Sequence, residues 1–82
     1  MKAKQRETYR TRILQLLRER SPGKTICPSE VLEAEDKHNK LMMEEVRSVA
    51  KELAADGVIE ICQSGKAIDP ETFKGPIRLR LK

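Results

Sequence analysis

The spacing of the apolar residues changes at Gly57, and this change limits the possible folds more than any other feature. Between Met42 and Leu53 apolar residues recur every three or four positions, as in a helix with one buried face. After Gly57 they alternate, most clearly at 77–81, where three aliphatic residues enclose two arginines. Alternation of this kind is typical of a strand with one buried face. The sequence therefore predicts helices first and a β-hairpin last.

Residues that begin and end helices refine this prediction. We expect helices at 5–20, 28–35 and 40–56, a short extended stretch at 24–27, and strands at 58–63 and 77–81. Pro28 suits a first helical position, and Glu30 suits the carboxylate position of a capping box. Asp36 or Asn39 can cap the helix at 40–56, and Gly57 is a suitable C-terminal stop.

Two short helices joined by a polar turn, with a hairpin after them, are typical of a winged helix-turn-helix. The predicted fold is α+β, with three helices, a short antiparallel sheet of two or three strands, and an elongated wing. The wing loop is expected to contain a turn at 69–72. The inward aliphatic residues should form one core: Ile13, Leu17, Leu32, Val46, Val49, Leu53, Ile59, Ile77 and Leu79.

Length and composition predict a single domain over residues 1–82 with a modest aliphatic core, since only Tyr9 and Phe73 are aromatic. No apolar run approaches the roughly 18 residues of a membrane span. The basic segment 1–12 has no apolar stretch with a cleavage site after it, so we expect no secretory signal. The expected compartment is the cytoplasm, with no membrane partner.

Residues that serve catalysis or metal binding are few and separated. His38 is the only histidine, and Cys27 and Cys62 form neither a CxxC motif nor a disulfide framework. They do not make a zinc set, and no nucleophile has a neighbouring base. We therefore expect no enzyme activity, no cofactor, no metal and no small-molecule substrate. Cys27 stands just ahead of a predicted helix, which leaves a redox role open, although a small buried residue is the simpler interpretation.

Charge is unevenly distributed along the chain. Residues 1–24 carry a net charge of +6, residues 25–63 carry −5, and residues 64–82 carry +3. A polyanion would therefore meet the two ends of the chain before the middle.

Two hypotheses of function follow. The first is binding of nucleic acid, most naturally double-stranded DNA in a transcription-related role, with the third helix in the major groove and the basic wing on phosphates. The candidate residues are Lys40, Arg47, Ser48 and Lys51 on the helix and Lys66, Lys74, Arg78 and Arg80 on the wing. Arg6, Arg10 and Arg12 of the first helix could extend the phosphate path. Four carboxylates at 44, 45, 52 and 56 oppose this use of the third helix. The second hypothesis is a protein-interaction module without DNA contact, since that acidic helix suits a basic partner.

A set of short motifs is spread over residues 22–79. They are PGKTICPSEV at 22–31, EVR at 45–47, LAADGVIE at 53–60, GK at 65–66, DPET at 69–72 and GPIRL at 75–79. In these motifs the chain resembles a bacterial family of small winged-helix-like domains of unknown function. The resemblance implies the winged-helix fold and no particular activity. Many family members have a tryptophan near position 40 or 41, where this chain has Lys40 and Leu41, so any role of that aromatic residue does not transfer.

Overall fold

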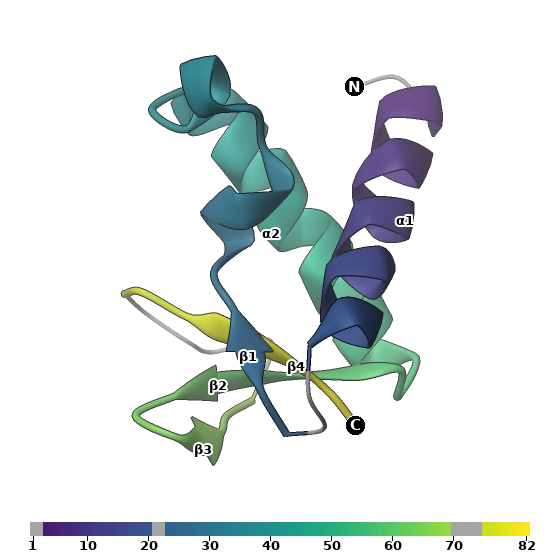
Figure 1. Cartoon of the computed structure of the whole chain (residues 1–82), viewed down its shortest axis with the longest axis vertical. Helices are drawn as coiled ribbons and strands as arrows, with labels where there is room; N and C mark the ends of the chain where they lie inside the picture. Colours follow the sequence, from purple (N-terminus) through teal and green to yellow (C-terminus); the bar gives the residue numbers. More distant parts are fainter. Residues whose placement is uncertain (1–2, 21–22, 70–74) are drawn as a thin grey trace.

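The computed structural model describes residues 3–20, 23–69 and 75–82, drawn in colour in Figure 1. Two α-helices, two 3-10 turns and four strands make up this part of the chain. In chain order they are α1 (Ala3–Glu19), β1 (Thr25–Ile26), η1 (Pro28–Val31), η2 (Ala34–Asp36), α2 (Lys40–Ala55), β2 (Ile59–Gln63), β3 (Lys66–Ala67) and β4 (Arg78–Leu81).

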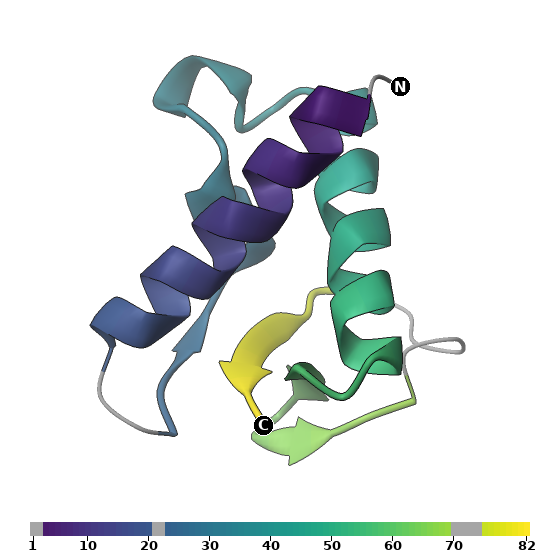
Figure 2. The same ribbon diagram turned by 90° about the vertical axis from the view of Figure 1, so that its right-hand side faces the viewer.

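The strands form one antiparallel sheet in the order β1-β4-β2-β3. The last strand therefore lies in the middle, with Leu79 opposite Ile26 of β1 on one side and opposite Ile61 of β2 on the other. Both α-helices lie on one side of this sheet, and in Figure 2 they spread apart toward it. The α+β class predicted from the sequence is confirmed.

The core fills the space between the helices and the sheet. All nine residues predicted to form it are buried in one cluster. The same cluster contains five further residues: Tyr9, Ile26, Val31, Ala50 and Ile61. Burial of roughly 25 cal/mol per Å² of apolar surface is the main force that holds the two layers together.

The prediction of three helices is wrong, because the segment expected to form a helix at 28–35 forms the two 3-10 turns η1 and η2. Val31 and Leu32 are both buried although they are neighbours in sequence, so no stripe at helical spacing holds this segment on the core. Glu33 is extended, with φ −64° and ψ 155°, and separates the turns. The start was predicted correctly: Glu30 Oε2 accepts a hydrogen bond from the Cys27 amide at 2.8 Å.

The ends of α2 agree with the sequence. Asn39 is its N-cap, and the Asn39 side-chain oxygen accepts from the Met42 amide at 3.1 Å. Gly57 follows the helix with φ +78°, a left-handed conformation that glycine adopts at little cost. Residues 40–55 are thus held as one rigid helix.

The sheet has four strands where two or three were expected. The added strand is β3, which pairs with the end of β2 through Cys62–Ala67 and Gln63–Lys66. Ser64 and Gly65 connect them with φ of 52° and 79°, as in the two-residue turns that match the twist of a hairpin. Lys66 and Ala67 are both exposed, so no alternation of apolar residues marked them as a strand. Of the turn expected at 69–72, residues 70–72 lie outside the described residues.

Candidate nucleic-acid interface

The outward face of α2 is the first predicted site, and its residues lie together. Glu44, Arg47, Ser48 and Lys51 line one shallow hollow on the helix. Glu44 is exposed, and the other three are half-buried. Lys40 is exposed at the first position of α2, two helical turns before Arg47 and therefore on the same side. All four candidate residues predicted on this helix thus share one face.

Contacts on either side of this face fix its place in the domain. Ser48 Oγ accepts a hydrogen bond from Arg6 Nη1 of α1 at 3.3 Å. On the other side, Arg47 Nη2 donates to the carbonyl oxygen of Gly75 at 3.5 Å, a long hydrogen bond. The face therefore lies between α1 and the residues that lead into β4.

The arginines of α1 face carboxylates of the same chain. Arg6 forms ion pairs with Glu45, at 3.0 Å, and with Glu52 of α2. Arg12 forms an ion pair with Glu33 at 3.0 Å. These pairs join α1 to α2 and to the segment before η2. Arg10, the third α1 arginine of the predicted phosphate path, lines a hollow between the two helices whose other residues are Arg6, Glu7 and Glu52.

Arg80 of the predicted wing set is paired in the same way. Arg80 and Glu60 are directly opposite each other on β4 and β2, with Nη2 and Oε2 2.9 Å apart. Their side chains are 28% and 26% exposed. The hydrogen bond to Glu60 raises the pKa of Arg80 above its ordinary value, and the Cys62 thiol adds to the shift. The guanidinium of Arg80 is therefore largely compensated within the sheet.

Arg78 leaves the same face of β4 but meets different partners. Its Nε donates to Thr25 Oγ1 at 2.8 Å, its Nη1 to Cys27 Sγ at 2.8 Å, and its Nη2 to the Thr25 carbonyl oxygen at 3.2 Å. All three acceptors belong to β1 or the residue after it. The side chain is fixed across two strands while the residue stays exposed.

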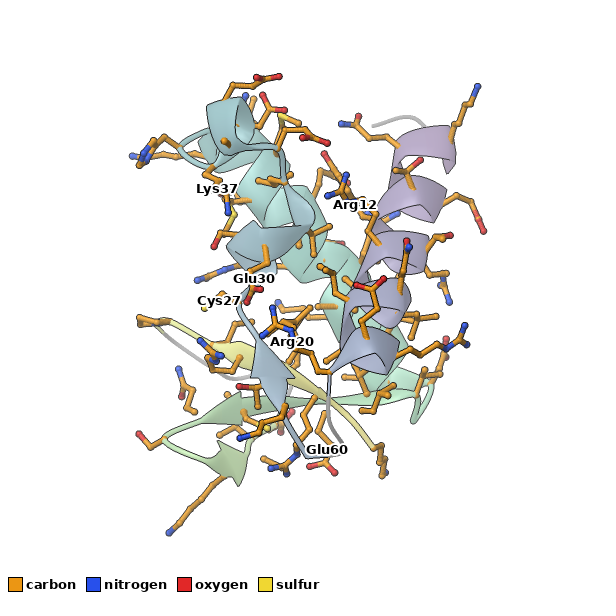
Figure 3. All side chains as sticks on the ribbon, viewed as in Figure 1. Arg12, Arg20, Cys27, Glu30, Lys37 and Glu60 are labelled. Atoms are coloured by element: carbon orange, nitrogen blue, oxygen red, sulfur yellow. The ribbon has the colours of Figure 1, made fainter. Side chains whose placement is uncertain are left out.

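Cys27 and Glu30 form a small polar cluster where β1 leads into η1, as Figure 3 shows. Arg78 contacts this cluster through its hydrogen bond to Cys27. The Cys27 amide donates to Glu30, which lowers the pKa of that carboxyl below its ordinary value. The partial burial of Glu30 opposes the shift, whereas the ion pair with Arg20 and the charge of Arg78 add to it. The Cys27 side chain is half-buried rather than enclosed in the core.

The remaining residues of the predicted wing set lie at the hairpin turn or outside the described residues. Lys66 is exposed at the start of β3, directly after the turn at Ser64 and Gly65. Lys74, the other predicted lysine of the wing, lies outside the described residues. We call residues 63–66 and 75–78 together the wing end, since Gln63 Nε2 donates to the Pro76 carbonyl oxygen at 3.0 Å and so joins the two segments.

Other kinds of site find no support among the described residues. In residues 3–20, 23–69 and 75–82 no three His, Cys, Asp or Glu side chains are grouped to hold a metal ion. No helix in these same ranges is both long and apolar enough to cross a membrane. Cys62 is buried but is not part of the main core cluster, and it lies opposite Arg78 of β4.

Sequence reasoning missed the residues that hold the arginines. No pattern in the sequence linked Thr25 to Arg78, from which it lies 53 positions away. Only the register of the sheet brings them together. One signal was available for Glu60, because cross-strand pairs of opposite charge stabilise antiparallel hairpins, and both Glu60 and Arg80 alternate outward.

Fold and site together define a small α+β domain with a helical face that adjoins the end of a β-hairpin. Residues 6–82 match the family described as protein of unknown function (DUF3253). The chain belongs to this family, which confirms the resemblance to a family of unknown function. No curated protein matches the chain.

Proposed function

We propose that the chain is a winged-helix domain that binds double-stranded nucleic acid, in the first place DNA. The sheet order supports this fold, because β1 and β2 flank β4 and the hairpin follows directly after α2. In this assignment η1 and η2 take the place of the middle helix of a helix-turn-helix, and α2 is the recognition helix.

The hydrogen bond from Arg47 to Gly75 is the observation that carries the proposal. It joins the outward face of α2 to the wing end, so that a duplex can contact both at once. The cations along this surface are Lys40, Arg47, Lys51, Lys66 and Arg78. The helix would enter the major groove, and the wing end would follow the phosphate backbone.

One carboxylate, Glu44, lies in the middle of this surface. A carboxylate near phosphates is repelled, whereas at a base edge it accepts a hydrogen bond from a cytosine amino group. Glu44 therefore fits the proposal if it points into the groove. Replacing it with glutamine should raise affinity for random duplexes and reduce discrimination between them.

A salt titration on random-sequence duplex DNA tests the proposal. The affinity of the whole chain should fall by about 0.9 logarithmic units per tenfold increase in salt for each phosphate neutralised. Arg47→Gln with Lys51→Gln should flatten this slope. Arg10→Gln with Arg18→Gln removes the same charge from α1 and is the matched control, with a smaller expected change. No duplex binding at low ionic strength would refute the proposal.

The second candidate is protein interaction, and one observation favours it. Leu41 is 76% exposed at the start of α2, where it lines a hollow with Gln5, Met42, Glu44 and Glu45. An exposed leucine beside acidic residues suits a basic, partly apolar protein segment. If Leu41→Lys leaves duplex binding unchanged, this hollow is separate from the nucleic-acid surface. If the wild-type chain does not bind DNA, Leu41 is the first residue to test for protein binding.

A further inference from the structure

The wing end contains a hollow in which Arg78 is held in a fixed position. Cys27, Gln63, Ser64, Pro76 and Ile77 line this hollow together with Arg78. It lies where the ends of β1 and β2 meet the start of β4. The hollow therefore opens beside the hairpin turn, on the side of the molecule that Arg47 joins to α2.

Part of the hydrogen-bonding capacity of Arg78 remains unused. A guanidinium has five N–H groups in a rigid plane, one on Nε and two on each Nη. One hydrogen on each of the three nitrogens is directed to Thr25 or Cys27. One N–H on each of Nη1 and Nη2 is left, and N–H groups of a guanidinium donate strongly to the oxygens of an oxyanion.

The charge of Arg78 is also available. Its three acceptors are a hydroxyl, a carbonyl oxygen and a sulfur atom, and no carboxylate of the described residues lies within 4.0 Å of its nitrogens. Glu30, whose pKa responds to Arg78, is already paired with Arg20. Two guanidiniums and one carboxylate leave this corner of the domain with a net charge of +1.

We propose that this hollow is an oxyanion subsite that takes a phosphate group on the two remaining N–H groups of Arg78, with the Ser64 hydroxyl as a further donor. The inference rests on the proposed function in one respect: in a complex with duplex DNA the oxyanion is a backbone phosphodiester. Because Thr25 and Cys27 already order the side chain, little conformational entropy is lost when the anion binds.

The first experiment compares two arginines of the same strand. Arg78→Gln should reduce the salt slope of duplex binding by about 0.9 logarithmic units per tenfold salt, as expected for one lost phosphate contact. Arg80→Gln combined with Glu60→Gln leaves the net charge of the chain unchanged and should keep the wild-type slope. Arg78→Lys should keep most of the slope but bind more weakly, because an ammonium has no fork.

The second experiment uses the wild-type chain, so it does not depend on whether a variant folds. Inorganic phosphate is titrated into the labelled protein while the Arg78 Nε–H and Ser64 amide resonances are followed. Both should shift and saturate, while the Arg12 Nε–H resonance, held by Glu33, should stay in place.

The combined outcomes separate the subsite from the function on which it rests. If inorganic phosphate shifts these resonances but duplex DNA does not bind, the subsite stands for a small phosphate compound and the nucleic-acid proposal fails. If duplex DNA binds while Arg78→Gln keeps the wild-type slope and phosphate moves neither resonance, the subsite is refuted and nucleic-acid binding stands.

Discussion

The side of α1 and the wing end use the same residue type for different purposes. Arg6 and Arg12 lie against carboxylates that belong to other elements of the fold. Arg78 is held as firmly, by three hydrogen bonds, but its acceptors carry no formal charge. The first arrangement joins elements and cancels charge, whereas the second orients a guanidinium and keeps its charge. An excess of basic residues in a sequence therefore does not show where an anion binds. The residues that each cation contacts in the fold show whether its charge is available.

Solvent exposure strengthens this contrast. The ion pairs around Arg6 are about one-third to one-half exposed, and pairs of this kind contribute roughly 0–1 kcal/mol each. Their contribution to stability is modest, but they remove two carboxylates of α2 from the electrostatic field that an approaching phosphate meets. The net negative charge of residues 25–63 should therefore repel phosphate from the α2 surface less strongly than the sequence alone indicated.

The largest expected effect comes from breaking the core that both regions share. Val49 of α2 is 1% exposed, so Val49→Asp places an unpaired charge among aliphatic side chains. The free energy of unfolding should fall by more than about 4 kcal/mol. A domain of this size should then be unfolded. Circular dichroism on heating measures it. Ala55→Asp, an exposed position on the same helix, is the control and should lose less than about 1 kcal/mol; a cooperative transition at the wild-type temperature in Val49→Asp would contradict the core described above.

A smaller effect tests the structural role of the α1 arginines. Arg6→Met removes the contacts to Glu45, Glu52 and Ser48 and should lower the free energy of unfolding by about 1 kcal/mol. Urea titration measures the change. Lys4→Met, exposed on the same helix, should change stability by less than about 0.5 kcal/mol. Duplex binding should stay at the wild-type level in Lys4→Met, whereas Arg6→Met leaves Glu45 and Glu52 without this partner and should weaken binding.

The smallest effect concerns pH. The Cys27 amide and, to a lesser degree, Arg20 lower the pKa of Glu30 in the folded chain. A carboxyl with a depressed folded pKa stabilises the fold above its unfolded pKa of about 4.3, and this contribution is lost as the pH falls through the lower folded value. The free energy of unfolding of the wild type should therefore exceed that of Glu30→Gln by at most about 1 kcal/mol at pH 7. This difference should shrink below about pH 4.

The control for this pH dependence is Arg20→Gln. Because the hydrogen bond from Cys27 is the first cause of the shift, part of the pH dependence should survive in Arg20→Gln. Urea unfolding at several pH values between 3 and 7 measures all three proteins. A difference between wild type and Glu30→Gln that grows as the pH falls would have the wrong sign and would contradict the cluster described here.

The sequence predicted those parts of the fold in which the spacing of apolar residues shows which side chains are buried. Apolar spacing predicted α2 to within one residue, and it predicted β2, β4 and the whole set of nine core residues. The prediction of a helix from Pro28 failed because its buried residues, Val31 and Leu32, are neighbours in sequence and do not recur at helical spacing. For β3 the conformation comes from the turn at Ser64 and Gly65 rather than from any pattern in Lys66 and Ala67.

The candidate site was predictable only in part, for a different reason. Helical spacing placed Arg47, Ser48 and Lys51 on one face. The difference between Arg78 and Arg80 depends on which residues β1 and β2 bring opposite β4, and alternation treats the two arginines alike. Pairing between distant elements, such as Arg6 with Glu45 across 39 positions, leaves no mark on local spacing.

A map of the duplex contact tests the central claim most directly. Amide and arginine Nε–H resonances of the whole chain are followed as a short random-sequence duplex is added at low salt. We expect shifts at Arg47 and Lys51 of α2 and at Ser64, Lys66 and Arg78 of the wing end, all of which should reverse on addition of salt. Resonances of Arg12 should stay in place. Shifts confined to α1, or no shifts at a duplex concentration well above that of the protein, would contradict duplex binding by α2 and the wing end.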